Sequence, residues 1–217
     1  MKTHTAESQA TMTPRKAMNF LKEGNERFVN NLKANRNLME QVDKTHQGQF
    51  AFATILHCID SRLSAELLFD QGIGDIFSIR IAGNFVNEDI LGSMEFASKI
   101  AGTKLILVMG HSHCGAIKGA CDRVRMGNLT ALINKLEPVV DIVEKEFETK
   151  GSGNPELVQQ VAEENVHYTI RQILKRSPIL EEMVDSGELG LVGAMYDIET
   201  GQVDFYEADT FLDDKKV

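Results

Sequence analysis

The chain alternates between short apolar runs and longer stretches in which apolar residues recur at helical spacing. Short runs rich in branched residues, each followed by a Gly or a polar residue, are typical of buried parallel strands. We predict three such strands, at residues 52–56, 76–81 and 105–109. A fourth run at 189–196 is followed by a turn and by alternating residues at 203–206, which predicts an antiparallel strand pair.

Helical spacing fills most of the intervals between these strands. Predicted helices cover residues 13–28, 64–69, 90–100, 115–124, 129–147, 158–174 and 179–184. Pro138 is expected to kink or restart the helix that contains it. Residues 32–49 are polar, and we interpret them as a loop.

Alternating strands and helices predict an α/β fold. We expect a central, mainly parallel sheet flanked by helices, with an antiparallel C-terminal edge strand and an N-terminal helical arm. The whole chain, 1–217, is predicted to be one domain, with the arm at 1–32, the core of the site at 50–120 and the C-terminal strands at 189–207. The arm could pack on its own sheet or on another subunit.

Side chains that commonly bind metals follow two of the predicted strands. Cys58 and Asp60 come after the first strand, and His111 and Cys114 come after the third. The carboxyl ends of parallel strands form the binding edge of an α/β sheet, so these residues are expected to meet there. Thiolate, imidazole and carboxylate ligands together favour zinc, and we predict one Zn²⁺ per chain.

A catalytic zinc needs one open coordination position, whereas four protein ligands usually make a closed structural site. Arg62 lies two residues after Asp60 and can hold its carboxylate with two parallel hydrogen bonds. Asp60 can therefore exchange zinc for Arg62 and leave a position to water. Two thiolate ligands make such a water less acidic than imidazoles would, so activity is expected to rise on the alkaline side.

The composition of the chain excludes some classes of binding partner. The chain has 23 basic and 32 acidic residues and a formal net charge of −9, which argues against nucleic acid or an anionic membrane surface. No stretch approaches the roughly 20 apolar residues that cross a bilayer. With three cysteines and no secretory signal pattern, we expect a cytoplasmic location.

Three motifs together resemble the β-class carbonic anhydrases: Cys58-Ile-Asp-Ser-Arg62, Arg80-Ile-Ala-Gly-Asn84 and Gly110-His-Ser-His-Cys-Gly115. The resemblance implies reversible hydration of carbon dioxide to bicarbonate and a proton by a zinc-bound hydroxide, oriented by the pair Asp60 and Arg62. It also implies a homodimer or a homotetramer.

The resemblance extends to residues of the substrate pocket. Gln49, Phe77, Asn84 and Gly115 match pocket positions of the family, and Phe96 stands where many members have Tyr. Phe77 and Phe96 could equally be core residues.

Some bacterial members of the family bind bicarbonate at a second, inhibitory site that uses a Trp. Ile55 occupies that position here and the chain has no Trp, although Arg80 matches the anion-binding Arg of the site. We therefore expect the inhibitory site to be absent or altered, with Asp60 off the zinc.

Three other functions remain open. With the same fold and metal, the chain could instead act on carbon disulfide or carbonyl sulfide, as relatives with the same zinc motif do. A closed zinc site would indicate a binding or scaffolding protein, but it would not need Arg62. A dithiol redox role is disfavoured because no Cys-x-x-Cys is present.

Overall fold

The computed structural model describes residues 3–206 and residue 211. The helical elements are α1 (Ala6–Ala10), α2 (Pro14–Val29), α3 (Leu38–Thr45), α4 (Ala65–Leu68), α5 (Glu88–Glu95), the π-helix η1 (Phe96–Ile100), α6 (Gly115–Cys121), α7 (Gly127–Val143), the 3₁₀ turn η2 (Glu144–Glu146), α8 (Pro155–Arg176) and α9 (Pro178–Asp185). The strands are β1 (Ala53–His57), β2 (Ile76–Arg80), β3 (Leu105–His111), β4 (Gly190–Tyr196) and β5 (Val203–Phe205).

The described strands form one sheet in the order β2-β1-β3-β4-β5. The first four strands are parallel, and β5 pairs with β4 in the antiparallel sense. β1, β3 and β4 are buried along their whole length, which explains their continuous apolar runs. The predicted α/β architecture, with its antiparallel C-terminal strand, is confirmed.

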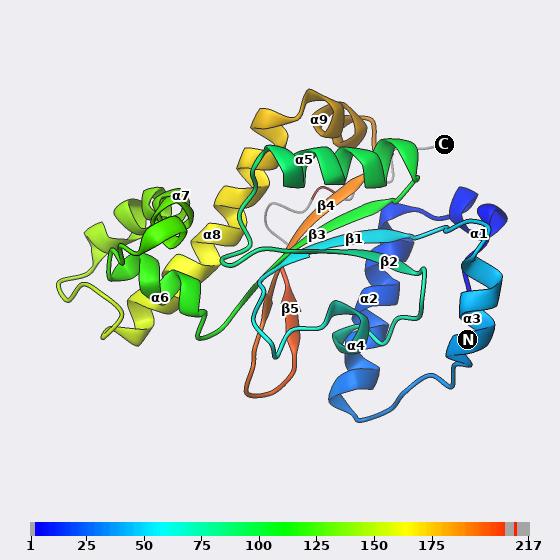
Figure 1. Cartoon of the computed structure of the whole chain (residues 1–217), viewed down its shortest axis with the longest axis horizontal. Coiled ribbons are helices and arrows are strands. Elements are labelled where there is room, and N and C mark those ends of the chain that lie inside the picture. Colours follow the sequence, from blue (N-terminus) through cyan, green and yellow to red (C-terminus); the bar gives the residue numbers. More distant parts are fainter. Residues whose placement is uncertain (1–2, 207–210, 212–217) are drawn as a thin grey trace.

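Helices surround the sheet (Figure 1). α6 and α7 lie beyond the carboxyl ends of β1 and β3, whereas α1 and α3 lie toward the opposite end. The long helix α8 packs on β3 and β4. A Cβ atom on Gly193 of β4 would lie 2.9 Å from Cγ1 of Val166 on α8. The lack of a side chain at Gly193 therefore permits the close packing of α8 on β4.

The N-terminal arm packs on its own chain in this structure. Thr13 caps α2 and Pro14 begins it, as the Thr-Pro pair predicts. On α2, the buried Asn25 donates to the carbonyl oxygens of Leu68 and Gly201 and accepts from the backbone N–H of Val203. α2 therefore connects α4 to the β4–β5 hairpin.

One local prediction was wrong, and one of the two alternatives for Pro138 is contradicted. Residues 32–49 are not all loop, because they contain α3, which Asn37 caps by accepting from the N–H of Glu40. Leu38 and Val42 stand one helical turn apart, but both are exposed, and Gln41 is the one buried residue of α3. Pro138 does not restart its helix: α7 runs through it to Val143.

Candidate metal centre

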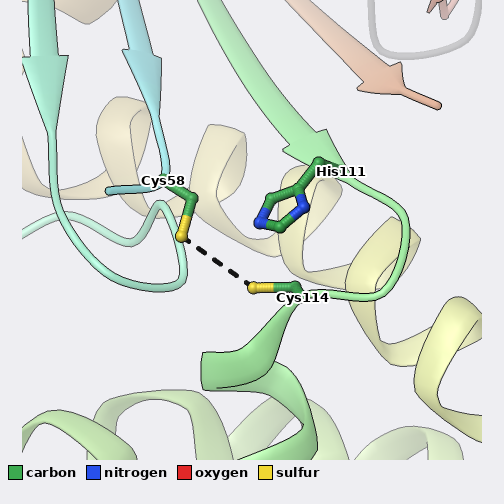
Figure 2. A group of neighbouring side chains, drawn as sticks. All are labelled: Cys58, His111 and Cys114. Atoms are coloured by element: carbon green, nitrogen blue, oxygen red, sulfur yellow. Dashed lines mark hydrogen bonds between the residues drawn. The ribbon is translucent and has the colours of Figure 1, made fainter. Parts of the chain in front are cut away.

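Three elements bring a Cys-His-Cys group together at the carboxyl edge of the sheet (Figure 2). Cys58 directly follows β1, and His111 is the last residue of β3. Cys114 is the residue before α6. Between the latter two, His113 has a left-handed backbone conformation with φ of 56°, which turns the chain from the strand into the helix.

The geometry of this group fits zinc. One ligand atom from each residue lies within 4.8 Å of the others, and the two Sγ atoms are 4.0 Å apart. Two sulfur ligands of a tetrahedral zinc, with Zn–S bonds of about 2.3 Å, lie about 3.8 Å apart. All three side chains are buried. The sulfur separation is therefore close to that of a zinc site.

The histidine is also oriented as a ligand. Nδ1 of His111 lies 2.9 Å from the carbonyl oxygen of Ser112, so Nδ1 carries the proton. Nε2 is then a lone-pair donor; it is buried and has no hydrogen-bond partner among the described residues. Figure 2 shows the imidazole turned toward the two sulfur atoms. A metal would satisfy this buried nitrogen.

The two thiols share one buried site. A hydrogen bond from Cys114 lowers the pKa of Cys58, while the same hydrogen bond and burial raise the pKa of Cys114. The backbone N–H of Gly83 lies 3.5 Å from Sγ of Cys58 and adds a further donor. Without a metal, one thiolate is thus stabilised beside one thiol.

Asp60, the fourth predicted ligand, is held by Arg62. Nε of Arg62 donates to Oδ1 of Asp60 at 2.9 Å, and Nη2 donates to Oδ2 at 2.7 Å. The backbone N–H of Arg62 donates to Oδ1 as well. These bonds keep the pKa of Asp60 well below its usual range. The structure thus places Asp60 in an ion pair, outside the group formed by the two cysteines and His111.

His57 and Arg80 support the loop that carries Cys58. His57 is fully buried, and burial, with the charge of Arg80, lowers its pKa to about 4. The ring is therefore neutral near pH 7, and Nδ1 donates to the carbonyl oxygen of Cys58 at 3.0 Å. Arg80 donates to the same carbonyl and to that of Asp60. Neither residue was assigned this supporting position from the sequence.

Two of the predicted pocket residues lie beside the Cys-His-Cys group. Asn84 is buried, has a φ of 38° and follows Gly83, whose N–H points at Cys58. Gly115 begins α6 directly after Cys114. A Cβ atom on Gly115 would have no neighbour within 4 Å, so this position faces open space.

Gln49, Phe77 and Phe96 are not brought to this edge by their own chain. Gln49 is exposed and precedes β1, whose length of about 16 Å at about 3.3 Å per residue separates it from Cys58. Phe77 pairs with Thr54 near the start of the strands. Phe96 begins η1, which leads to the amino end of β3, and it is 53% exposed.

Helix α8 contributes two polar residues that sequence reasoning missed. Asn165 donates from Nδ2 to the carbonyl oxygen of Gly83, and Thr169 donates to that of Asn84. Both are buried within an apolar helix face. Polar residues at core positions of the helical pattern were the available signal, and they hold the turn beside Cys58.

Comparison with known proteins identifies the family. The model of the carbonic anhydrase family matches residues 53–203. Carbonic anhydrase 2 of Mycobacterium tuberculosis is 35% identical over 197 residues, which cover 87% of this chain and 91% of that protein. The carbonic anhydrase of Mycolicibacterium smegmatis is 33% identical, covering 88% and 92% of the two chains.

Solved structures show the same fold. The β-carbonic anhydrase CcaA superposes with a TM-score of 0.70 at 27% identity, covering 89% of this chain and 98% of that one. A tetrameric β-carbonic anhydrase of Sordaria macrospora gives a TM-score of 0.69 at 23% identity over 78% and 91% of the chains. The chain therefore belongs to the β-class carbonic anhydrases, and its Cys-His-Cys group fits the zinc of a carbon dioxide hydratase.

Proposed function

We propose that Cys58, His111 and Cys114 hold one zinc ion and that Asp60, paired with Arg62, acts beside it in the reversible hydration of carbon dioxide. A zinc ion at this site would lower the pKa of a water molecule bound to it. The pairing of Asp60 with Arg62 is the observation that supports this function best, since it leaves the group with three protein ligands. A closed structural site would use Asp60 as the fourth.

Each side chain has a distinct part in this proposal. The Asp60 carboxylate is ionised and accepts a hydrogen bond from the attacking water, which orients a lone pair at the substrate carbon. Arg62 keeps the carboxylate in that position. Asn84 follows Gly83, whose N–H reaches Cys58, and Gly115 follows Cys114, so carbon dioxide is proposed to bind beside these two residues.

A homo-oligomer would give the remaining pocket residues a role. Gln49, Phe77 and Phe96 lie away from the Cys58 edge of their own chain, so only a second copy could bring them to it. A dimer or tetramer is therefore proposed, and its mass can be measured by sedimentation. We also propose a cytoplasmic location. No described helix is long and apolar enough to cross a membrane.

Stopped-flow hydration of carbon dioxide by protein of verified zinc content tests the activity. Rates should be measured at neutral and at mildly alkaline pH. Fast turnover that increases with pH is expected, and Asp60→Ala should reduce it at full zinc content. Absence of turnover with one tightly bound zinc would contradict the proposal, and carbon disulfide and carbonyl sulfide would then be tested as substrates.

A further inference from the structure

Arg80 is the last residue of β2, and its side chain binds the loop that follows β1. It lies opposite His57 in the parallel register. Nε of Arg80 donates to the carbonyl oxygen of Cys58 at 3.3 Å, and Nη2 donates to that of Asp60 at 2.8 Å. One guanidinium thus spans the backbone of two residues of the proposed site.

The carbonyl oxygens that Arg80 contacts each have a second donor. The Cys58 carbonyl also accepts from Nδ1 of His57, whose Nε2 lies 2.9 Å from the Ser78 hydroxyl. The Asp60 carbonyl also accepts from the backbone N–H of Leu63 at 3.0 Å. Arg80 therefore completes a network that fixes the main chain on both sides of Ile59.

Fixing the main chain of Asp60 fixes the direction of its Cα–Cβ bond. From that starting point the carboxylate reaches Arg62, which binds both oxygens. Any movement of Asp60 that turned its main chain would break the bond to Arg80. Arg62 thus binds the side chain of Asp60, and Arg80 binds its backbone carbonyl oxygen.

We propose that Arg80 is a positioning residue that keeps Asp60 on Arg62 and so keeps the fourth coordination position of the metal open. The proposal rests on the proposed function, because it assumes a metal held by Cys58, His111 and Cys114. It gives the guanidinium fork a specific use: two donors in fixed geometry reach two carbonyl oxygens, which a Lys ammonium cannot match.

The test uses full-length protein loaded with Co²⁺, whose visible absorption reports the number and type of its ligands. Azide, a small anion that binds an open coordination position, is titrated into the wild type, Arg80→Gln and Arg80→Lys at one mildly alkaline pH. If the open state falls to about a tenth of its population, the apparent azide Kd rises about tenfold. We expect this in Arg80→Gln, together with an altered spectrum before azide is added, and a smaller change in Arg80→Lys.

Arg176→Gln is a matched control. Nη1 of Arg176 also donates to a backbone carbonyl, that of Val86 at 3.0 Å, but Arg176 lies at the end of α8. Its loss should lower the melting temperature without changing the spectrum or the azide Kd. If Arg80→Gln behaves in the same way, the positioning role is wrong.

Two other results would also decide between the role of Arg80 and the proposed function. Should Arg80→Gln fail to fold, Arg80→Lys decides by the same two measurements, and wild-type values in it would overturn the proposal. A wild type that binds no azide would contradict the open position and therefore the proposed function. Normal azide binding in both the wild type and Arg80→Gln would overturn the role of Arg80 alone.

Discussion

The sulfur atoms of Cys58 and Cys114 lie 4.0 Å apart although 56 positions separate the residues. The distance results from the parallel pairing of β1 with β3, which ends both strands at one edge of the sheet. His111 enters the same space from the end of β3. If both sulfur atoms carry a negative charge, a cation between them stabilises the pair, because two buried negative charges in contact are otherwise unfavourable.

Loss of one thiolate should therefore remove the metal. Changes to residues behind metal ligands already cost about 10- to 100-fold in affinity, so Cys114→Ser should cost at least about 100-fold. Zinc content after dialysis against a chelator, measured by elemental analysis, checks this. Cys121→Ser is the control: Cys121 is buried on α6 but lies outside the Cys-His-Cys group. Equal zinc retention in both variants would show that Cys114 is not a ligand.

The strand–helix alternation and the residues at strand ends were sufficient to predict the sheet and the meeting of Cys58 with Cys114. Both depend on local sequence patterns and on the rule that parallel strands end at a common edge. The support behind the site was not predictable in this way. Asn165 reaches Gly83 across 82 positions, and nothing in the spacing of either residue specifies that contact.

Helix α3 illustrates a different limit. Its N-cap at Asn37 and the ion pair between Glu40 and Lys44 are local signals, but each is worth only a few tenths of a kcal/mol to about 1 kcal/mol. The helix does have apolar residues at helical spacing, Leu38, Met39 and Val42, but all three are more than 40% exposed and its one buried residue is Gln41.

Replacing Arg62 by Lys should reduce turnover while zinc content is retained. Arg62 binds both oxygens of Asp60, and a Lys ammonium would act as one point charge without the fixed fork. A misplaced orienting group typically costs about 10- to 100-fold in rate, so kcat for hydration should fall within that range. Stopped-flow kinetics at matched zinc content measures it.

Arg125→Lys is the control for this change. Arg125 is half-exposed like Arg62 and forms an ion pair with Glu137 at 2.7 Å, but away from the Cys-His-Cys group. Its turnover should equal that of the wild type. The role given to Arg62 would be wrong if Arg62→Lys also kept the wild-type kcat.

The close packing of α8 on β4 predicts that Gly193→Ala destabilises the protein. The added Cβ would meet Val166 at 2.9 Å and Ile170 at 3.1 Å. Overpacking of this kind costs about 1–3 kcal/mol, which denaturant unfolding can measure. Adding Val166→Ala should recover part of the loss, because Val166 is the nearest obstacle. Gly92→Ala, whose Cβ would have no neighbour within 4 Å, should not be destabilising; if it cost as much as Gly193→Ala, contact with α8 would not be the cause.

The buried ion pairs of Asp70 make stability depend on acid pH. Burial by itself would raise the pKa of Asp70, but hydrogen bonds from Arg27 and Arg36 outweigh it and lower the pKa. A carboxylate with a lowered pKa in the folded state contributes stability that is present above its ordinary pKa of about 4 and is lost as pH falls through the folded value. Asp70→Asn should therefore lower the free energy of unfolding by about 3 kcal/mol at neutral pH, because Arg36 stays buried without its counter-charge. The variant should also show a flatter dependence of stability on pH below about pH 4.

Urea unfolding between neutral and acid pH checks both effects. Asp141→Asn removes a carboxylate that is 60% exposed from its pair with Arg123, so it should cost less than about 1 kcal/mol. An unchanged acid dependence in Asp70→Asn would assign that dependence to other carboxylates.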